Sequence, residues 1–253
     1  MYCGIGIALF YLQDKCLLHP SKLAPEYKFS FKSPFKELTI PVNNTDTISL
    51  IHFFPSNAIK KGIVIYFHGN AGNVEAYSKP ADFFTDKGYE VLMSDYPGFG
   101  KSTGVITEQK LYQQAFQLYK LAQQYYQEDS IIVYGQSFGT GIAANLASYS
   151  KPRHLILESP YSSIPDLFRS YTYIYPVASM ANFKLPTIEY VADVKAPIII
   201  FHSPDDEVIP FSCAEKIKQS LKSTDKFITI EGASHNNISA SDAYNSEMNR
   251  LLQ

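Results

Sequence analysis

"YGQSFGTG" (residues 134–141) follows the apolar run "IIV" and leads into the small-residue stretch "IAANLAS". It places a Gly-x-Ser-x-Gly pattern, from Gly135 to Gly139, where a strand passes into a helix. This context is typical of a nucleophile elbow, a strained turn that exposes a serine above a sheet. The flanking positions are expected to be glycine because a Cβ atom would collide with the neighbouring strand or helix. We therefore interpret Ser137 as a nucleophile; the alternative is a glycine-rich turn without chemistry.

Strands and helices alternate on both sides of this turn. Apolar, β-branched runs predict eight strands: "KELTIPV", "ISLIHFF", "GIVIYF", "YEVLMSDY", "SIIVYG", "HLILES", "PIIIFH" and "KFITIEG". Helical spacing predicts helices between them, including residues 107–126 with Thr107 as N-cap, 138–149 and 212–222. Most of the runs lack polar alternation, which indicates a mostly parallel sheet covered by helices on both faces. The sequence thus predicts an α/β fold over residues 35–253, with an irregular, aromatic-rich lid insertion at about 160–194.

Composition excludes several classes of protein. The chain has 253 residues, 45% of them hydrophobic, enough for one large domain with a substantial core. Its formal net charge is −2 and its longest basic run is Lys60–Lys61, so no nucleic-acid partner is expected. Cys3, Cys16 and Cys213 are too scattered for a disulfide framework or a zinc site. We expect no metal and no organic cofactor.

The N-terminal segment, residues 1–34, is open to three interpretations. The run "YCGIGIALFYL" from Tyr2 to Leu12 is apolar and uncharged, but shorter than the ~20 residues that span a bilayer. It lacks the basic leader of a secretory signal. A shortened membrane anchor, a helix that packs on the core and an export signal all stay open. We therefore expect this segment to be the part of the chain that could contact a membrane surface. The location of the protein, membrane-associated or cytoplasmic, stays open.

A serine nucleophile needs a base, and the chain offers three downstream histidines. His154 begins a predicted strand and His202 ends one, so each has a structural interpretation. His235 follows the last strand in the polar loop "EGASHNN", at the carboxyl end of the sheet. The order of serine, acid and then histidine is the one expected on this kind of sheet. We therefore predict His235 as the base.

The acid is expected in the loop after "PIIIFH". There "SPDDEVIP" offers Asp205, Asp206 and Glu207, and the residues alone do not choose among them. Asp95 is a rival by type, but it precedes the serine and lies in "SDYPGFG", which we interpret as a bracing turn.

The motifs "YFHGNAGN", "SDYPGFGKSTG", "GQSFGTGIA", "ESPYSS", "FHSPDDEVIP" and "EGASHNN" together resemble the α/β-hydrolase superfamily of serine hydrolases. They are similar to its short-lid group, which includes membrane-anchored members and protein depalmitoylases. The resemblance covers residues 35–253 and implies the α/β-hydrolase fold. Aligning the group's acid motif on His202 and Pro210 implies Asp206 as the acid. Ser203 stands where the group usually has glycine, which keeps Asp205 as an alternative.

Two backbone N–H groups are expected to form an oxyanion hole. One comes from Phe138, the residue after the nucleophile. The resemblance implies that the other comes from Asn70 or Ala71, just after the His-Gly pair, and that His68 braces this loop. Asn73 is expected to fasten the same loop or to cap the helix that follows.

The resulting hypothesis is hydrolysis of carboxylic esters or thioesters through an acyl-enzyme, on a small-molecule or acylated substrate. A peptidase-like hydrolase, acyl or haloperoxidase-type transfer on the same residues, and a non-catalytic ligand-binding protein are the alternatives. Aromatic side chains of the lid are expected either to line an acyl pocket or to cover the sheet: Tyr161, Phe168, Tyr171, Tyr173, Tyr175 and Phe183.

Overall fold

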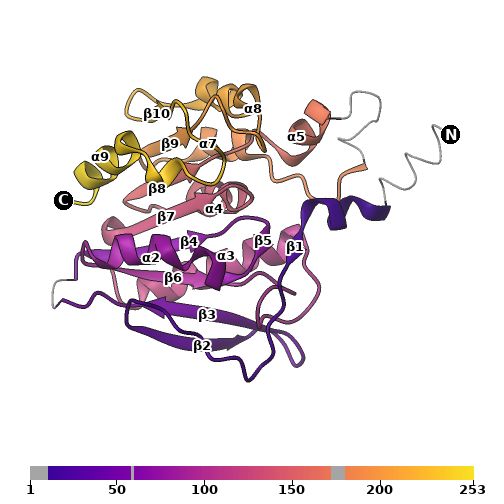
Figure 1. Ribbon diagram of the computed structural model, residues 1–253, viewed down its shortest axis with the longest axis vertical. Helices are drawn as coiled ribbons and strands as arrows, with labels where there is room; N and C mark the ends of the chain where they lie inside the picture. Colours follow the sequence, from indigo (N-terminus) through magenta and orange to yellow (C-terminus); the bar gives the residue numbers. More distant parts are fainter. Residues whose placement is uncertain (1–10, 58–59, 172–179) are drawn as a thin grey trace.

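The computed structural model of the protein describes residues 11–57, 60–171 and 180–253. An eight-stranded sheet forms its centre (Figure 1). From edge to edge the strands are β10 (Lys226–Thr229), β9 (Ile198–His202), β8 (His154–Glu158), β7 (Ile131–Gln136), β4 (Gly62–Phe67), β6 (Tyr89–Ser94), β3 (Thr47–Phe53) and β2 (Phe35–Pro41). The pairs β2–β3 and β3–β6 are antiparallel, and the other neighbours are parallel. The predicted eight strands and mostly parallel sheet are confirmed.

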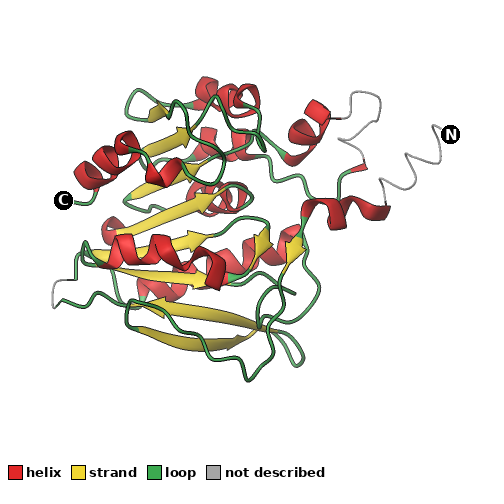
Figure 2. Ribbon diagram, viewed as in Figure 1, coloured by secondary structure: helices red, strands yellow, loops and turns green. Residues whose placement is uncertain are grey.

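Helices cover both faces of the sheet (Figure 2). The helices α2 (Ser78–Thr85) and α9 (Asp242–Leu251) bury their apolar side chains on one face. The other face is covered by α3 (Glu108–Gln123), α4 (Gly139–Ser148), α7 (Thr187–Asp193) and α8 (Phe211–Glu215). Within β4, Ile63, Ile65 and Phe67 point to the second group of helices, whereas Val64 and Tyr66 point to the first. This two-residue period explains why the apolar run of β4 shows no polar alternation.

The helix α3 forms as the sequence predicts. Leu111, Ala115, Leu118 and Ala122 are buried along one face of α3. Thr107 is its N-cap, and the Thr107 hydroxyl accepts a hydrogen bond from the Lys110 N–H at 3.2 Å. The predicted cap is therefore confirmed.

Two segments differ from the prediction. The helix expected over residues 212–222 is α8 followed by the 3-10 helix η3 (Lys216–Ser220), a tightening common where an α-helix ends. The lid region, expected to be irregular, contains α7 and α5 (Ile164–Tyr171). Near the start of α5 the Ser163 hydroxyl accepts from the Asp166 N–H. These helices are too short for the apolar spacing to be recognised in the sequence. The remaining 3-10 helices are η1 (Val74–Tyr77), η2 (Glu128–Ser130) and η4 (Ile238–Ala240).

The N-terminal segment packs along the sheet domain. Residues 11–17 are helical, and β1 (His19–Pro20) pairs in parallel with β5 (Ala71–Gly72), next to it in Figure 1. The side chains of Leu17, Leu18 and Phe29 are buried. The run from Tyr2 to Leu12 lies outside the described residues except for its last two members, so a membrane anchor there stays a prediction. In the described part of the chain, no helix has the length and apolar character needed to cross a membrane.

Candidate active site

The Gly-x-Ser-x-Gly segment forms a sharp turn between β7 and α4. Ser137 has a φ of 51°, in the left-handed region that is unfavourable for a residue with a side chain. The Ser137 N–H donates to the Glu158 carbonyl at 2.8 Å, and the Ser137 carbonyl accepts from the Thr140 N–H at 2.9 Å. A Cβ atom on Gly135 would lie 2.6 Å from the Gly139 carbonyl oxygen, and one on Gly139 would overlap the Phe67 carbonyl. The expected need for both glycines is confirmed.

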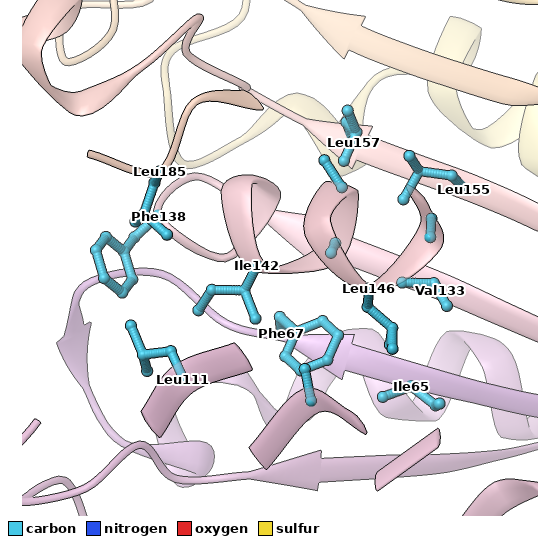
Figure 3. Close-up of a cluster of buried hydrophobic side chains, with 14 of the residues drawn as sticks. Ile65, Phe67, Leu111, Val133, Phe138, Ile142, Leu146, Leu155, Leu157 and Leu185 are labelled. Carbon is cyan, nitrogen blue, oxygen red and sulfur yellow. The ribbon is translucent and has the colours of Figure 1, made fainter. Parts of the chain in front are cut away.

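The helix α4 lies against the sheet, which fixes the direction of this turn. Its residues Ile142 and Leu146 pack beside Phe67 and Val133 of the strands (Figure 3). A Cβ atom on Gly141 would lie 2.6 Å from the Tyr161 hydroxyl, so the small residue permits a close approach to the lid. The Tyr161 hydroxyl in turn donates to the Phe138 carbonyl at 2.9 Å.

Ser137, His235 and Asp206 form a continuous chain of hydrogen bonds. His235 Nε2 lies 2.9 Å from Ser137 Oγ, and His235 Nδ1 lies 2.8 Å from Asp206 Oδ2. The Asp206 carboxylate also accepts from the Val208 and Ile209 N–H groups at 2.9 and 2.7 Å. Burial raises the pKa of Asp206, but these hydrogen bonds outweigh it and hold the pKa below its usual value. The structure thus brings together the three residues that the sequence selected.

The neighbouring acidic residues have different partners. Asp205 Oδ2 accepts from the Gly232 N–H at 2.9 Å, and Glu207 Oε2 accepts from the His235 backbone N–H at 3.0 Å. Both therefore hold the backbone of the loop that carries His235, whereas Asp206 contacts the imidazole. Ser203, at the position usually taken by glycine, is buried and accepts from the Asp205 N–H at 3.1 Å. It turns the loop without displacing Asp206 from His235.

His68 lies at the start of the loop after β4 and His202 at the end of β9, and each holds the loop that follows it. His68 Nδ1 lies 2.7 Å from the Gly69 carbonyl, so this nitrogen carries the proton and donates. Burial lowers the pKa of His68 to about 4, which keeps the imidazole neutral. His202 is also buried, and its Nε2 lies 3.0 Å from the Ile209 carbonyl. Neither contacts Ser137, in line with the structural role expected for each.

Asp95 and Asn73 hold the loop that follows β4. Asp95 Oδ1 accepts from the Val74 N–H at 2.8 Å, and burial raises the pKa of Asp95 to about 7. Asn73 caps η1 by accepting from the Glu75 N–H at 2.9 Å, and its amide donates to the Ser21 carbonyl at 3.2 Å. The bracing interpretation of Asp95 and both roles expected for Asn73 are therefore confirmed.

The three N–H groups considered for the oxyanion hole differ in their partners. The Ala71 N–H hydrogen-bonds to the Tyr77 hydroxyl, which occupies that donor. Within the described ranges, the N–H groups of Asn70 and Phe138 have no hydrogen-bond partner. Phe138 directly follows Ser137, and a second unpaired donor from the loop after β4 is what an oxyanion hole requires. Asn70 is thus the better candidate of the two residues that the resemblance left open.

A buried polar cluster lies beneath the elbow, and the sequence did not predict it. The Tyr134 hydroxyl donates to the Glu158 carboxylate and lies 2.9 Å from the Tyr244 hydroxyl. The Gln136 amide donates to Glu158 Oε1 at 3.2 Å and accepts from the Tyr66 hydroxyl at 2.7 Å. Burial raises the pKa of Glu158 to about 7. The cluster joins β4, β7, β8 and α9; its one sequence signal is the glutamate that ends the apolar run "LILE".

The aromatic residues of the lid occupy different environments. Tyr161 is buried against the elbow, and Phe183 is buried with its ring 6.2 Å from that of Phe138. Phe168 is partly buried against the same core. Tyr171 is 57% exposed, and its hydroxyl donates to the Val208 carbonyl, two residues beyond Asp206. Tyr173 and Tyr175 lie outside the described residues.

Comparison with solved structures identifies the fold. An esterase of Pyrococcus furiosus superposes with a TM-score of 0.69, covering 93% of this chain and 96% of the esterase chain. The sequences are only 17% identical, so this likeness shows the α/β-hydrolase fold alone. The fold and the Ser137–His235–Asp206 arrangement together define the class of α/β-hydrolases.

A family comparison narrows this class. Residues 58–188, more than half of the chain, match the hydrolase family described as serine aminopeptidase, S33. The chain belongs to this family, and the resemblance to the α/β-hydrolase superfamily is confirmed.

Individual relatives extend beyond that region. An uncharacterised protein of Acanthamoeba polyphaga mimivirus is 33% identical over 271 residues, covering 94% of this chain and 90% of its own. The lysophosphatidylserine lipase ABHD12 of Macaca fascicularis is 30% identical over 185 residues, covering 63% of this chain. The match covers 45% of that lipase, so the chain spans less than half the lipase's length.

Proposed function

We propose that this hydrolase cleaves carboxylic ester or thioester bonds through an acyl-enzyme on Ser137. The observation that carries the proposal is the hydrogen-bonded chain from Ser137 Oγ through His235 to Asp206, with distances of 2.9 and 2.8 Å. A serine held at a φ of 51° with an imidazole at its hydroxyl is costly as a purely structural feature. A non-catalytic ligand-binding protein would gain nothing from it.

The proposed reaction has two steps on the same residues. His235 Nε2 takes the proton from Ser137 Oγ as the oxygen attacks the acyl carbon, and Asp206 stabilises the imidazolium. The N–H groups of Phe138 and Asn70 bind the alkoxide that develops. The imidazolium then gives its proton to the leaving alcohol or thiol. In the second step His235 deprotonates a water, which attacks the acyl-enzyme; the bond to Ser137 Oγ breaks, the imidazolium returns the proton to that oxygen, and the carboxylic acid is released.

The acidic residues near Asp206 are already hydrogen-bonded, which favours esters and thioesters over peptides as substrates. An aminopeptidase needs carboxylates that are free to bind the substrate's amine. Here Asp205 and Glu207, the acidic neighbours of Asp206, hold the Gly232 and His235 backbone N–H groups. Monoacyl glycerophospholipids belong among the test substrates because a relative is a lysophosphatidylserine lipase.

Fluorophosphonate labelling followed by intact-mass measurement tests the proposal. We expect a single adduct on the wild type and on Ser148→Ala, a matched variant in helix α4, because an activated serine attacks phosphorus. Ser137→Ala should carry no adduct and should lose on the order of 10⁶ in turnover. An unlabelled, folded wild type, or a labelled Ser137→Ala, would contradict the proposal.

A substrate panel tests the bond that is cleaved. p-Nitrophenyl esters and acyl thioesters of graded chain length, a lysophospholipid and an amino-acid p-nitroanilide cover the candidate classes. We expect kcat/KM to be highest for an ester or thioester. A preference for the p-nitroanilide would establish the peptidase alternative instead.

A further inference from the structure

In the proposed reaction the Asn70 N–H faces the alkoxide. The peptide group that contains this N–H joins Gly69 to Asn70, and His68 holds it in place. In a trans peptide group the C=O bond and the N–H bond point in opposite directions. The Gly69 carbonyl accepts from His68 Nδ1 at 2.7 Å, which directs the Asn70 N–H to the opposite side. The residue's orientation then depends on what holds its other peptide group.

That second peptide group is held by a segment about 50 residues earlier in the chain. We call residues 17–23 the N-terminal strap. The His19 N–H donates to the Asn70 carbonyl at 2.9 Å, and the Asn70 side-chain amide donates to the Leu17 carbonyl at 2.5 Å. The Ser21 N–H donates to the Gly72 carbonyl at 2.8 Å. The strap thus contacts Asn70 through both backbone and side chain.

The strap is itself fixed on its other side. The Ser21 carbonyl accepts from the Gly100 N–H at 3.0 Å, and the Leu23 N–H donates to the Gly100 carbonyl at 2.9 Å. Leu17 and Leu18 are buried in the hydrophobic core that also contains Phe138. The strap therefore connects the loop after β4 to the loop after β6, and its position is determined by the core.

We infer that the N-terminal strap is a positioning element of the oxyanion hole, an inference that rests on the proposed function. With the Asn70 carbonyl turned to His19, the next N–H, that of Ala71, points away to Tyr77, and the Asn70 N–H has no partner among the described residues. Without the His19 donor the peptide group between Asn70 and Ala71 loses one of the contacts that hold it, and a rotation there shifts the Asn70 backbone and with it the Asn70 N–H. Oxyanion donors act through fixed geometry, so this rotation lowers the rate of the chemical step.

One pair of variants at position 19 isolates the contact. The His19 side chain is exposed, so His19→Ala removes the imidazole and keeps the backbone N–H. His19→Pro removes the N–H, in a segment that already continues into Pro20 as an extended strand. Asn70→Ala, which removes only the hydrogen bond to Leu17, is the second variant should His19→Pro fail to fold.

The measurements are kcat and KM for the best ester, the Ki of a trifluoromethyl ketone that forms a tetrahedral adduct, and Tm. We expect His19→Pro to lower kcat and to raise the Ki of the ketone by about ten- to a hundredfold each. Both changes are smaller than the 10² to 10³ loss expected when an oxyanion donor is deleted. KM should change much less, and His19→Ala should match the wild type. Asn70→Ala should lower kcat by about tenfold.

A strap that only supports the fold gives a different result. In that case folded His19→Pro and Asn70→Ala have a lower Tm but wild-type kcat and ketone Ki, which overturns the inference. Equal losses in His19→Ala and His19→Pro also overturn it, since both would then come from the imidazole. A wild type that hydrolyses no ester and takes no fluorophosphonate contradicts the proposed function instead, so the two failures are distinguishable.

Discussion

The loop after β9 carries the acid of the proposed triad and the loop after β4 carries a proposed oxyanion donor, yet the two loops are held in different ways. In the first, Asp206 accepts from Val208 and Ile209, and His202 contacts the Ile209 carbonyl, so the supports lie within eight residues. In the second, residues 69–73 are held largely by the strap at residues 17–23. The Asp206 carboxylate is thus oriented by contacts within its own loop, whereas the loop after β4 depends on a remote segment. Changes in the strap should therefore affect the proposed oxyanion hole before they affect the hydrogen-bonded chain of Ser137, His235 and Asp206.

Asp206→Asn should produce the largest loss among the tests of this comparison. The amide oxygen can still accept from Val208 and Ile209, so the local loop should persist. The charge that stabilises the imidazolium is lost, and kcat should fall by about 10⁴. Steady-state kinetics and circular dichroism check this prediction. A misfolded Asp206→Asn would show that the loop needs the carboxylate itself.

Asp205→Ala should have a much smaller effect, because the contact between the acid loop and the His235 loop is redundant. The variant loses the bond from the Gly232 N–H, but Glu207 still holds the His235 N–H. We expect kcat to fall by about two- to fivefold, the scale of one hydrogen bond. A loss larger than that of His19→Pro would reverse the proposed order of the two loops.

Asp95→Asn should have the smallest effect on turnover at neutral pH, but it should change how stability depends on pH. Burial raises the pKa of Asp95 from 3.8 to about 7 in the folded protein. The folded state therefore binds the proton more tightly, and this group lowers the free energy of unfolding as pH rises from about 4 to about 7. Asp206, with its lowered pKa, acts oppositely: its contribution is present above pH 3.8 and is lost as pH falls further.

Urea unfolding at several pH values measures this difference. The wild type should lose stability between about pH 4 and pH 7 more steeply than Asp95→Asn, since the amide does not titrate. Parallel curves for the two proteins would mean that Asp95 is not a titrating brace of the oxyanion loop.

The sequence predicts best what short-range contacts determine. The elbow was predictable because Gly135 and Gly139 have no room for a Cβ atom and the serine between them is set by one turn. The strands were predictable because both faces of the sheet are covered. By contrast, Asp205, Asp206 and Glu207 are equivalent in composition, and the motif alignment was needed to select Asp206.

The remaining features depend on backbone direction and on distant segments. As candidate oxyanion donors, Asn70 and Ala71 are distinguished by where their backbone N–H groups point, which residue type does not encode. The strands β1 and β5 have two residues each, too few for any alternation to indicate them. Glu158 is predictable as the end of a strand, but its contacts with Tyr134 and Gln136 come from register.

The most direct test of the proposed reaction is to trap the acyl-enzyme. Wild type and Ser137→Ala are mixed with p-nitrophenyl butyrate, quenched in acid within the first turnovers and analysed by intact mass and peptide mapping. We expect a butyryl group on the peptide that contains Ser137 in the wild type and none in the variant, which should also be inactive. Ester hydrolysis that persists in Ser137→Ala, or a butyryl group on another residue that turns over at the steady-state rate, would contradict it.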